Sequence, residues 1–519
     1  MNGTPESSQP KTPATANAGA RNEYRPPLGH YLAVAGFILF AVFAPHSIAA
    51  AEIALAIATA GWLLRTISTG RAGLRHTKLD LPILLFFLWT IASAILSVEP
   101  RISIAKLQSV CVLFAFYLTQ AMVTRRTAII LVSIMILSGV AGTVWSLYDL
   151  IRGRGVVVAS VAVDSPFRQI QTETGDATSP FKPPLVQLEK GDAVWRVGPY
   201  RVYSVSEIDE VIRKAGAGSV ASRLSVSVIT HGEHAEWPGF VVTQELKARP
   251  SPSGISGAGR SHRFRASGWT RHYEYFAEIL QILAQLSLGL ALANLRNHGA
   301  NRRFKLAMVA SLLLAFGIAF TAMRTVLVAF AIGACVIAWR ASRGATKLIL
   351  TAAIAGVLGF GAVVIWETRA INALSLQDAS SSLRTRVARV GLSRILLHPI
   401  FGHGMDAMKK HWSEWGFPGN VMIHLHSTPL QIAFDRGLPA LLFWLWIIVA
   451  FWLLTTRAEK FTRDSSDTNR EGILLGATGA LAGFFASSLV NYNFGAGIVA
   501  LVFWWLMGVV VVLARNEER

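Results

Sequence analysis

The sequence predicts an α-helical polytopic membrane protein with about twelve transmembrane helices and one small α/β insert. Of its 519 residues, 52% are hydrophobic and 15% are charged, and the mean hydropathy is +0.45. Lipid must therefore solvate much of the chain, because a single aqueous core cannot hide so much apolar surface. The formal charge of +19 does not indicate nucleic-acid binding, since polytopic proteins gather Lys and Arg in their cytoplasmic loops.

The apolar runs divide into two membrane blocks that follow a polar tail. Residues 1–26 are rich in Pro, Ser, Thr and Ala and lack an apolar core, so we expect a disordered cytoplasmic tail and no cleaved signal. The first block, 27–150, has about five runs long enough to span lipid, near 30–45, 48–66, 81–97, 104–123 and 127–149. The second, 271–519, has about seven, near 272–295, 306–322, 325–339, 348–366, 438–455, 472–490 and 495–514. Both cysteines, Cys111 and Cys335, lie within such runs and predict neither a disulfide nor a zinc site.

Charge in the short loops predicts the orientation. Lys and Arg concentrate in alternate connections, at 65–78, 125–126, 296–305, 340–347 and 457–470. We therefore expect these loops and both termini in the cytoplasm of a bacterial inner-membrane protein. Two long loops, about 150–271 and 367–437, then face the periplasm. Arg324 is the one charge near the middle of the long apolar stretch 306–339, which predicts a tight hairpin with the arginine at its tip.

The first long loop reads as a separate domain, 151–248. Apolar and polar residues alternate in GVVVASVAV (155–163) and SRLSVSVIT (222–230), two strand signals, and SEIDEVIRKA (206–215) between them is helical. This order, with a KGD turn at 190–192, resembles a bacterial PDZ domain over roughly 155–245. The resemblance implies an open groove between strand and helix that accepts an extended peptide from a protein partner. A periplasmic spacer without a ligand is the alternative, and 249–270 reads as a flexible linker.

The second long loop carries the residues suited to chemistry. HLHSTPLQIAFDRG (424–437) offers Thr428 as an N-cap, Pro429 at the first helical position and Gln431 to complete a capping box, while Gly437 ends the helix. His426 is then held just outside a helix N-terminus, where free N–H groups and the helix dipole favour an anion such as a diphosphate. Its imidazole could take a proton from an attacking hydroxyl, or could serve only as a hydrogen-bonded cap.

An arginine-rich helix precedes this segment. Residues 383–397, LRTRVARVGLSRILL, carry Arg384, Arg386, Arg389 and Arg394 and end at His398-Pro399. A row of arginines at a lipid surface commonly binds headgroups. Glu274 and Glu278 lie one helical turn apart at the start of the sixth apolar run, where they could assist proton movement or act as interfacial anchors.

Together these motifs resemble the bacterial O-antigen ligase and O-antigen polymerase superfamily. The resemblance rests on Arg384 upstream of HPIFGHG (398–404), followed by the segment HSTPLQIAFDRGLPALLF (426–443). RASGWTRHYEYFAEILQILAQLSLGLAL (265–292) and the arginine tip TAMRTVLVAF (321–330) extend it. It implies transfer of a glycan from an undecaprenyl-diphosphate carrier to an acceptor hydroxyl, such as one on lipid A-core or another glycan, without metal or cofactor. A ligase is favoured, and a polysaccharide polymerase or a protein O-glycosyltransferase remains an alternative.

The resemblance also implies roles for individual residues. Arg324 and Arg384 would grip the diphosphate, because guanidinium groups match phosphate oxygens and stay charged. His426 would be the base or would position the acceptor. Further substrate-binding candidates are Arg265, Arg386, Arg389 and Ser427, with Gly402 and Gly404 permitting a tight turn.

Two other classes of membrane protein were weighed against this interpretation. An intramembrane protease would need HExxH or a GxSxG-like serine site, and neither string occurs; HGEH at 231–234 has the wrong spacing. A transporter or lipid flippase with twelve helices would commonly consist of two related halves, and no evident repeat relates the two blocks.

Overall fold

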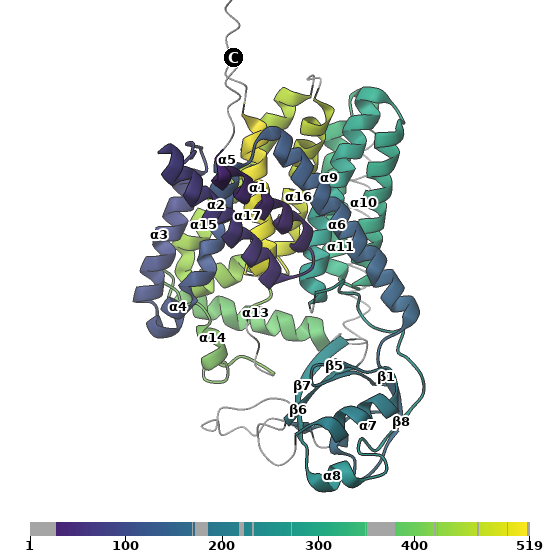
Figure 1. The fold of residues 1–519 in the computed structure, drawn as a ribbon. Helices are drawn as coiled ribbons and strands as arrows, with labels where there is room; N and C mark the ends of the chain where they lie inside the picture. The colour runs from purple at the N-terminus through teal and green to yellow at the C-terminus, as the bar shows by residue number, and fades with distance from the viewer. Residues whose placement is uncertain are drawn as a thin grey trace, which may run out of the picture.

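The computed structural model of the chain is mostly helical and carries one β-sheet domain at the end of a helical block (Figure 1). It describes residues 27–168, 170–171, 185–216, 223–230, 233–270, 272–347, 349, 379–419, 422, 424–463, 467–495 and 497–515. The predicted span 348–366 and the predicted tail 1–26 therefore lie almost entirely outside the described residues.

The first membrane block contains four helical segments before the insert and one that leads into it. These are α1 (Leu28–Phe43), α2 (Ile48–Thr69), α3 (Asp80–Leu96), the broken segment α4 (Pro100–Lys106), η1 (Leu107–Leu113) and α5 (Phe114–Met122), and α6 (Arg125–Arg152). Side-chain caps fix two of the starts: Ser47 Oγ accepts from the N–H of Ala50, and Thr124 Oγ1 accepts from that of Thr127. The predicted span at 104–123 is thus a helix with a 3₁₀ middle.

The second block supplies the centre of the bundle. Its elements are α9 (Tyr273–His298), α10 (Arg302–Phe320), α11 (Arg324–Ala341), α13 (Ala379–Leu397), α14 (Ala407–Lys410), α15 (Thr428–Thr462), α16 (Thr468–Ser488) and α17 (Gly497–Ala514). Helices α9 and α17 are buried along most of their length. Small residues allow a close contact between α9 and α16: a Cβ on Gly289 would lie 2.3 Å from the backbone nitrogen of Gly476.

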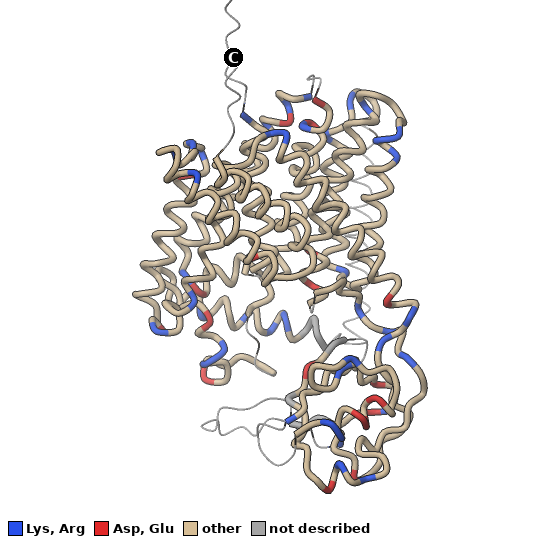
Figure 2. Tube along the Cα trace, in the orientation of Figure 1, with Lys and Arg blue, Asp and Glu red and all other residues tan. Residues whose placement is uncertain are grey.

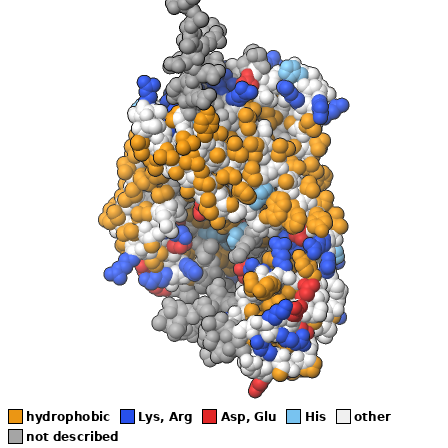
Figure 3. Space-filling view, in the orientation of Figure 1, with side chains coloured by type: hydrophobic (Ala, Val, Ile, Leu, Met, Phe, Trp, Pro, Cys, Tyr) orange, Lys and Arg blue, Asp and Glu red, His pale blue; other side chains and the backbone are white. Residues whose placement is uncertain are grey.

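The polytopic class predicted from composition is confirmed. Eight of the described helices are long and apolar enough to cross a membrane, and α1 and α3 are shorter apolar helices at two further predicted spans. Hydrophobic side chains cover the visible face of the helical block in a broad band (Figure 3). Lys and Arg of the short loops gather at the end of the block opposite the sheet domain (Figure 2). The loops predicted to be cytoplasmic therefore share one end, and the insert lies at the other.

The insert is an antiparallel sheet with strand order β7-β6-β4-β1-β8. Its elements are β1 (Val156–Val161), η2 (Pro166–Arg168), β2 (Ile170–Gln171), β3 (Leu185–Val186), β4 (Ala193–Val197), β5 (Tyr200–Arg201), α7 (Val205–Lys214), β6 (Arg223–Thr230), β7 (Glu233–Val241), α8 (Gln244–Ala248) and β8 (Ile255–Gly257). The two strands and the helix predicted from alternation and periodicity are present as β1, β6 and α7. Inward-facing residues such as Val194, Val226 and Ile208 form its separate core.

The predicted linker 249–270 is not a free tether. Its residues 255–257 form β8, which pairs with β1 on the side of the sheet where α7 packs, and a Cβ on Gly257 would lie 2.9 Å from Val205 at the start of α7. Ser253 N–H also donates to Asp209 Oδ1 of α7 at 2.8 Å. The edge of β1 beside β8, where the PDZ resemblance implies an open groove, is therefore paired with the chain's own strand, which satisfies the backbone groups of that edge.

Candidate functional site

The second long loop is a packed structure at the insert end of the block. Helix α13 lies across the end of the membrane helices (Figure 1), and Val387, Trp412, Trp415 and Phe434 belong to a small apolar core that joins the loop to α15. Two ion pairs connect the loop to the first membrane block. Lys410 Nζ lies 2.8 Å from Glu99 Oε1, and Lys106 Nζ lies 3.0 Å from Asp406 Oδ2. The loop is thus held firmly enough to position catalytic side chains.

A kink in α15 sets the direction of its first two turns. Gly437 has φ 81° in the middle of the element, and Leu438 N–H donates to the carbonyl of Pro399 at 2.7 Å. Gly402 and Gly404 have φ 70° and 105°; a Cβ on the first would lie 2.5 Å from the backbone of Asp435, and one on the second 2.3 Å from Ser103 Oγ. Close packing explains both glycines, against backbone for Gly402 and against serine side chains for Gly404, which agrees with the predicted tight turn, and neither lines the cavity described below.

The start of α15 differs from the predicted capping box. The helix begins at Thr428, and no side chain caps it. Gln431 Oε1 instead accepts from Leu425 N–H at 2.6 Å, and Gln431 Nε2 donates to Asp435 Oδ1 at 2.8 Å. Ser427 is buried in the N-cap position. The capping prediction was wrong because Thr428 Oγ1 is engaged by a distant loop, donating to the carbonyl of Asn491 and to Asn493 Oδ1, each at 3.0 Å.

Two imidazole rings lie edge to face in the segment before this helix. The rings of His424 and His426 lie 4.4 Å apart at 90°, and His426 has a left-handed backbone with φ 52°. Burial, which is the largest cause, the neighbouring His424 and the Arg384 charge together lower the pKa of His426 to about 3. Burial and Arg384 also lower the pKa of His424. Both rings are therefore neutral at physiological pH, and Arg384 lies close enough to act on both.

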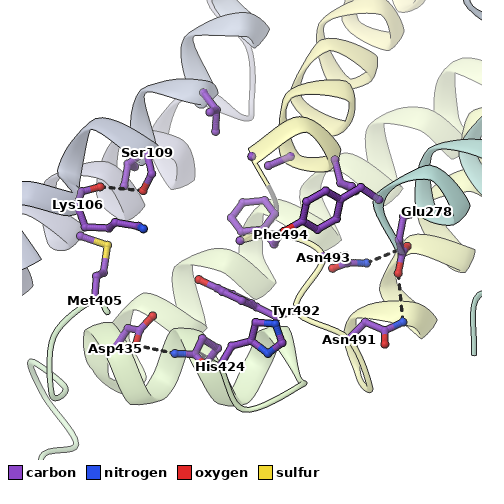
Figure 4. Close-up of a pocket in the computed structure, with 18 of the residues that line it drawn as sticks. Lys106, Ser109, Glu278, Met405, His424, Asp435, Asn491, Tyr492, Asn493 and Phe494 are labelled. Atoms are coloured by element: carbon purple, nitrogen blue, oxygen red, sulfur yellow. Dashed lines mark hydrogen bonds between the residues drawn. The ribbon is translucent and has the colours of Figure 1, made fainter. Parts of the chain in front are cut away.

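These histidines line a cavity of about 610 Å³ between the two membrane blocks. Polar and charged residues from both blocks share its wall: Glu52, Lys106, Gln108, Ser109, Glu274, Glu278, Asp406, His424, His426, Gln431, Asp435, Arg436, Asn491, Tyr492 and Asn493. Figure 4 shows His424 beside Tyr492, with Lys106 and Met405 on one side of the tyrosine and Glu278, Asn491 and Asn493 on the other. One side of the cavity thus pairs cations with carboxylates, since Lys106 lies 3.0 Å from Asp406 and Arg436 follows Asp435, and the other side carries Glu278 with two amides.

The loop between α16 and α17 joins the parts of the site and was missed by the sequence analysis. Asn491 Nδ2 donates to Glu278 Oε1 of α9 at 3.2 Å and to Thr325 Oγ1 of α11 at 3.1 Å. Asn491 and Asn493 also bind Thr428 at the start of α15. A pair of asparagines between two apolar spans, in VNYNFG, was the available signal.

Three predicted arginines lie around the cavity and outside its wall. Arg384 is half-buried on α13 and acts electrostatically on both histidines. Arg324 is exposed as the first residue of α11, between Met323, which lines the cavity, and Thr325, which binds Asn491. Arg265 stacks over Tyr273 at 4.6 Å, near the start of α9.

The remaining arginines divide differently. Arg386 and Arg389, predicted to bind substrate, are exposed on α13 and do not line the cavity. Arg436, to which the sequence motifs assign no role, is 7% exposed and lines the cavity. Its guanidinium contacts Met405 Sδ at 3.2 Å, and its Nε has no hydrogen-bond partner. Within the described residues, no group of His, Cys, Asp and Glu side chains could hold a metal ion.

Comparison with known families gives one match. Residues 309–445 match the family model described as O-Antigen ligase. The matched segment runs from α10 past the kink of α15 and includes Arg324, Arg384 and His426. A search of curated proteins finds no match to the chain. The family match supports a relationship to the O-antigen ligase superfamily and a membrane glycosyltransferase-like role.

Proposed function

We propose that this protein transfers a glycan from an undecaprenyl-diphosphate carrier to an acceptor hydroxyl at the periplasmic face of the bacterial inner membrane, in the manner of an O-antigen ligase. One observation carries the proposal: two neutral imidazoles in a cavity wall lie within the field of Arg384, inside the segment that matches the ligase family. The proposed acceptor is lipid A-core or another glycan.

The cationic groups suit the leaving group. Guanidinium forks bind phosphate oxygens in pairs and remain charged at any physiological pH. Arg384 and Arg324 would hold the diphosphate at the rim, and the buried Arg436 would supply charge from the cavity wall. Because the diphosphate gains negative charge as it departs, fixed cations in a partly dry site stabilise the transition state more than the ground state.

The imidazole suits the incoming group. The acceptor oxygen forms a bond to the anomeric carbon of the donor sugar while the bond from that carbon to the diphosphate oxygen breaks. The electron pair of the broken bond leaves with the diphosphate, and the hydroxyl proton passes to an unprotonated ring nitrogen of His426. The neutral state of His426 is the state that this transfer requires.

A histidine substitution tests the base assignment. His426→Ala should reduce transfer by about 10²–10⁴-fold while membrane abundance stays normal, because general base catalysis contributes that much. His76→Ala, at a fully exposed ring in a loop predicted to be cytoplasmic, is the matched control and should transfer normally. Full activity in His426→Ala would remove the base assignment.

A deletion strain distinguishes the possible acceptors. We expect long glycans stranded on the lipid carrier, together with loss of glycan from the surface glycolipid, if the protein is a ligase. Single repeats on the final acceptor would indicate a polymerase, and an unglycosylated protein would indicate a protein O-glycosyltransferase. If neither the carrier-linked pool nor the surface glycans change, a transporter or lipid flippase becomes the better interpretation.

A further inference from the structure

Glu278 is a buried carboxylate in the cavity wall, on the other side of Tyr492 from Lys106 (Figure 4). Its residue is 3% exposed within α9, yet it lines the cavity. Oε1 accepts from Ser487 Oγ and from Asn491 Nδ2, and Oε2 accepts from Asn493 Nδ2 at 3.4 Å (Figure 4). A carboxylate offers about four acceptor positions, so the long contact to Oε2 leaves room for another donor.

Helix packing alone does not require a charge at this position. One and two turns further along α9, Gln281 and Gln285 make the corresponding links with neutral amides. Gln281 Nε2 donates to the carbonyl of Ala480 on α16 at 3.5 Å, and Gln285 Nε2 donates to that of Phe330 on α11 at 3.2 Å. A buried carboxylate costs more free energy than an amide. Its occurrence where α9 borders the cavity therefore points to a role toward a ligand.

The chemistry of this group excludes the diphosphate as its partner. A carboxylate repels an anion, and the neighbouring donors of Asn491, Asn493 and Ser487 are already directed to Glu278 itself. What remains is an acceptor of hydrogen bonds, which suits an uncharged hydroxyl. A carboxylate in the cavity wall therefore suits a sugar hydroxyl of the acceptor rather than the diphosphate of the donor.

We propose that Glu278 binds the acceptor, with its carboxylate accepting a hydrogen bond from a sugar hydroxyl of the acceptor and orienting that sugar toward His426. Asn491 and Asn493 are positioning residues, since each holds the carboxylate and also the start of α15. This inference rests on the proposed function and adds a division of labour to it: cations hold the donor, and Glu278 holds the acceptor.

The test separates acceptor binding from donor binding. Purified protein in lipid nanodiscs is given carrier-linked glycan and surface glycolipid, both extracted from the deletion strain, and undecaprenyl diphosphate serves as a donor-side inhibitor. Glu278→Gln keeps the size of the side chain and removes its charge. We expect the KM for the glycolipid to rise by about tenfold or more, as for loss of a hydrogen bond to a charged group. Inhibition by undecaprenyl diphosphate should be unchanged.

Control variants exclude a purely structural effect. Glu278→Asp keeps the charge and should restore part of the acceptor affinity, whereas Glu210→Gln removes an exposed carboxylate of the insert and should behave as wild type. Arg384→Lys should show the reverse pattern, with weaker inhibition by undecaprenyl diphosphate. An unchanged KM for the glycolipid in Glu278→Gln, or an equal loss of undecaprenyl diphosphate inhibition, would overturn the Glu278 assignment alone. Absence of transfer by the wild-type protein would overturn the proposed function and this inference together.

Discussion

His426 combines a strained backbone with a partly buried side chain in the cavity wall. A left-handed conformation at a residue other than glycine costs of order 1–3 kcal/mol, and His426 adopts it with φ 52°. The ring is fixed by its edge contact with His424 rather than by a helix cap. Strain of this kind persists only where surrounding structure enforces it. Here the enforcing contacts are those of the following residues, which the 489–495 loop holds in place.

The low pKa of His426 predicts a particular pH dependence. A base works in its unprotonated form, so activity falls as pH drops through its pKa; in the free protein that pKa is lowered to about 3. A bound diphosphate places negative charge nearby and raises the pKa in the complex. We therefore expect kcat to decline at a higher pH than kcat/KM, which reports the free protein. Measured pH profiles in which kcat/KM declines first would contradict this order.

Sequence patterns identified some residues of the site and could not identify others. His426 and Arg384 were found because a motif places them in one short region of the chain. Arg436 was missed because only the folded chain brings it to the cavity wall. Asn491 was missed because its hydrogen-bond partners are about 60 to 210 residues away along the chain. The role of Gln431 was predicted wrongly for a related reason. A capping box is a local pattern, but the hydroxyl of Thr428 is hydrogen-bonded to the distant loop between α16 and α17.

At the scale of elements, the kink of α15 connects the HPIFGHG turn to the segment 424–437, which we propose to be catalytic. Gly437 ends the two turns that follow His426, and the carbonyls of Pro399 and Ile400 lie against it. The turn after α13 thereby fixes how the start of α15 faces the cavity. The prediction that Gly437 interrupts the helix is confirmed. Its contact with Ile400 could not be deduced from the spacing of residues in the sequence.

A pair of alanine substitutions tests this contact. Gly437→Ala would place a Cβ 1.8 Å from the Ile400 carbonyl oxygen at φ 81°, whereas Gly416→Ala meets the same kind of backbone strain, at φ 77°, with no atom within 4 Å. We expect Gly437→Ala to lower the thermal midpoint in detergent by more than its control, by the equivalent of about 1–3 kcal/mol of overpacking. Equal midpoints would show that the contact with Ile400 is unimportant.

The pairing of strand β8 with β1 changes what we expect of peptide binding by the insert. A short edge strand that fills a peptide groove must leave before another peptide can pair with β1. Ser160 and Ser256 are paired across these strands, with hydroxyls 2.7 Å apart, which makes them suitable for a disulfide. In a background without Cys111 and Cys335, Ser160→Cys with Ser256→Cys should form that bond under oxidising conditions and lock β8 in place.

The locked and reduced forms of that protein then test peptide binding. A labelled peptide with the sequence of residues 252–260, PSGISGAGR, should bind the reduced form better than the oxidised form, as measured by fluorescence anisotropy. The reduced form is the matched control, because both forms have the same sequence. Equal binding would place the peptide elsewhere, and absence of binding to both would favour the spacer interpretation of the insert.

For the whole molecule, hydropathy predicted the arrangement best. Long apolar runs are recognisable without knowledge of distant contacts, so eleven predicted spans have matching helices among the described residues, and the basic loops share one end. The insert was predicted as strands and a helix for the same reason. What hydropathy could not supply was the docking of the second long loop onto the first block, since that depends on single ion pairs such as Lys410 with Glu99.

The insert can be removed without separating the two membrane blocks. Arg154 and Ser261 exchange both backbone hydrogen bonds, at 2.8 and 3.0 Å, so the chain enters and leaves the domain side by side. Replacing 155–260 with Asn-Gly, a two-residue hairpin turn, should therefore preserve α6 and α9. We expect normal membrane abundance and continued basal transfer, because no residue of the insert lines the cavity. Glycan chain length or transfer efficiency should change if the insert recruits a partner. Complete loss of transfer at normal abundance would show instead that the insert forms part of the catalytic unit.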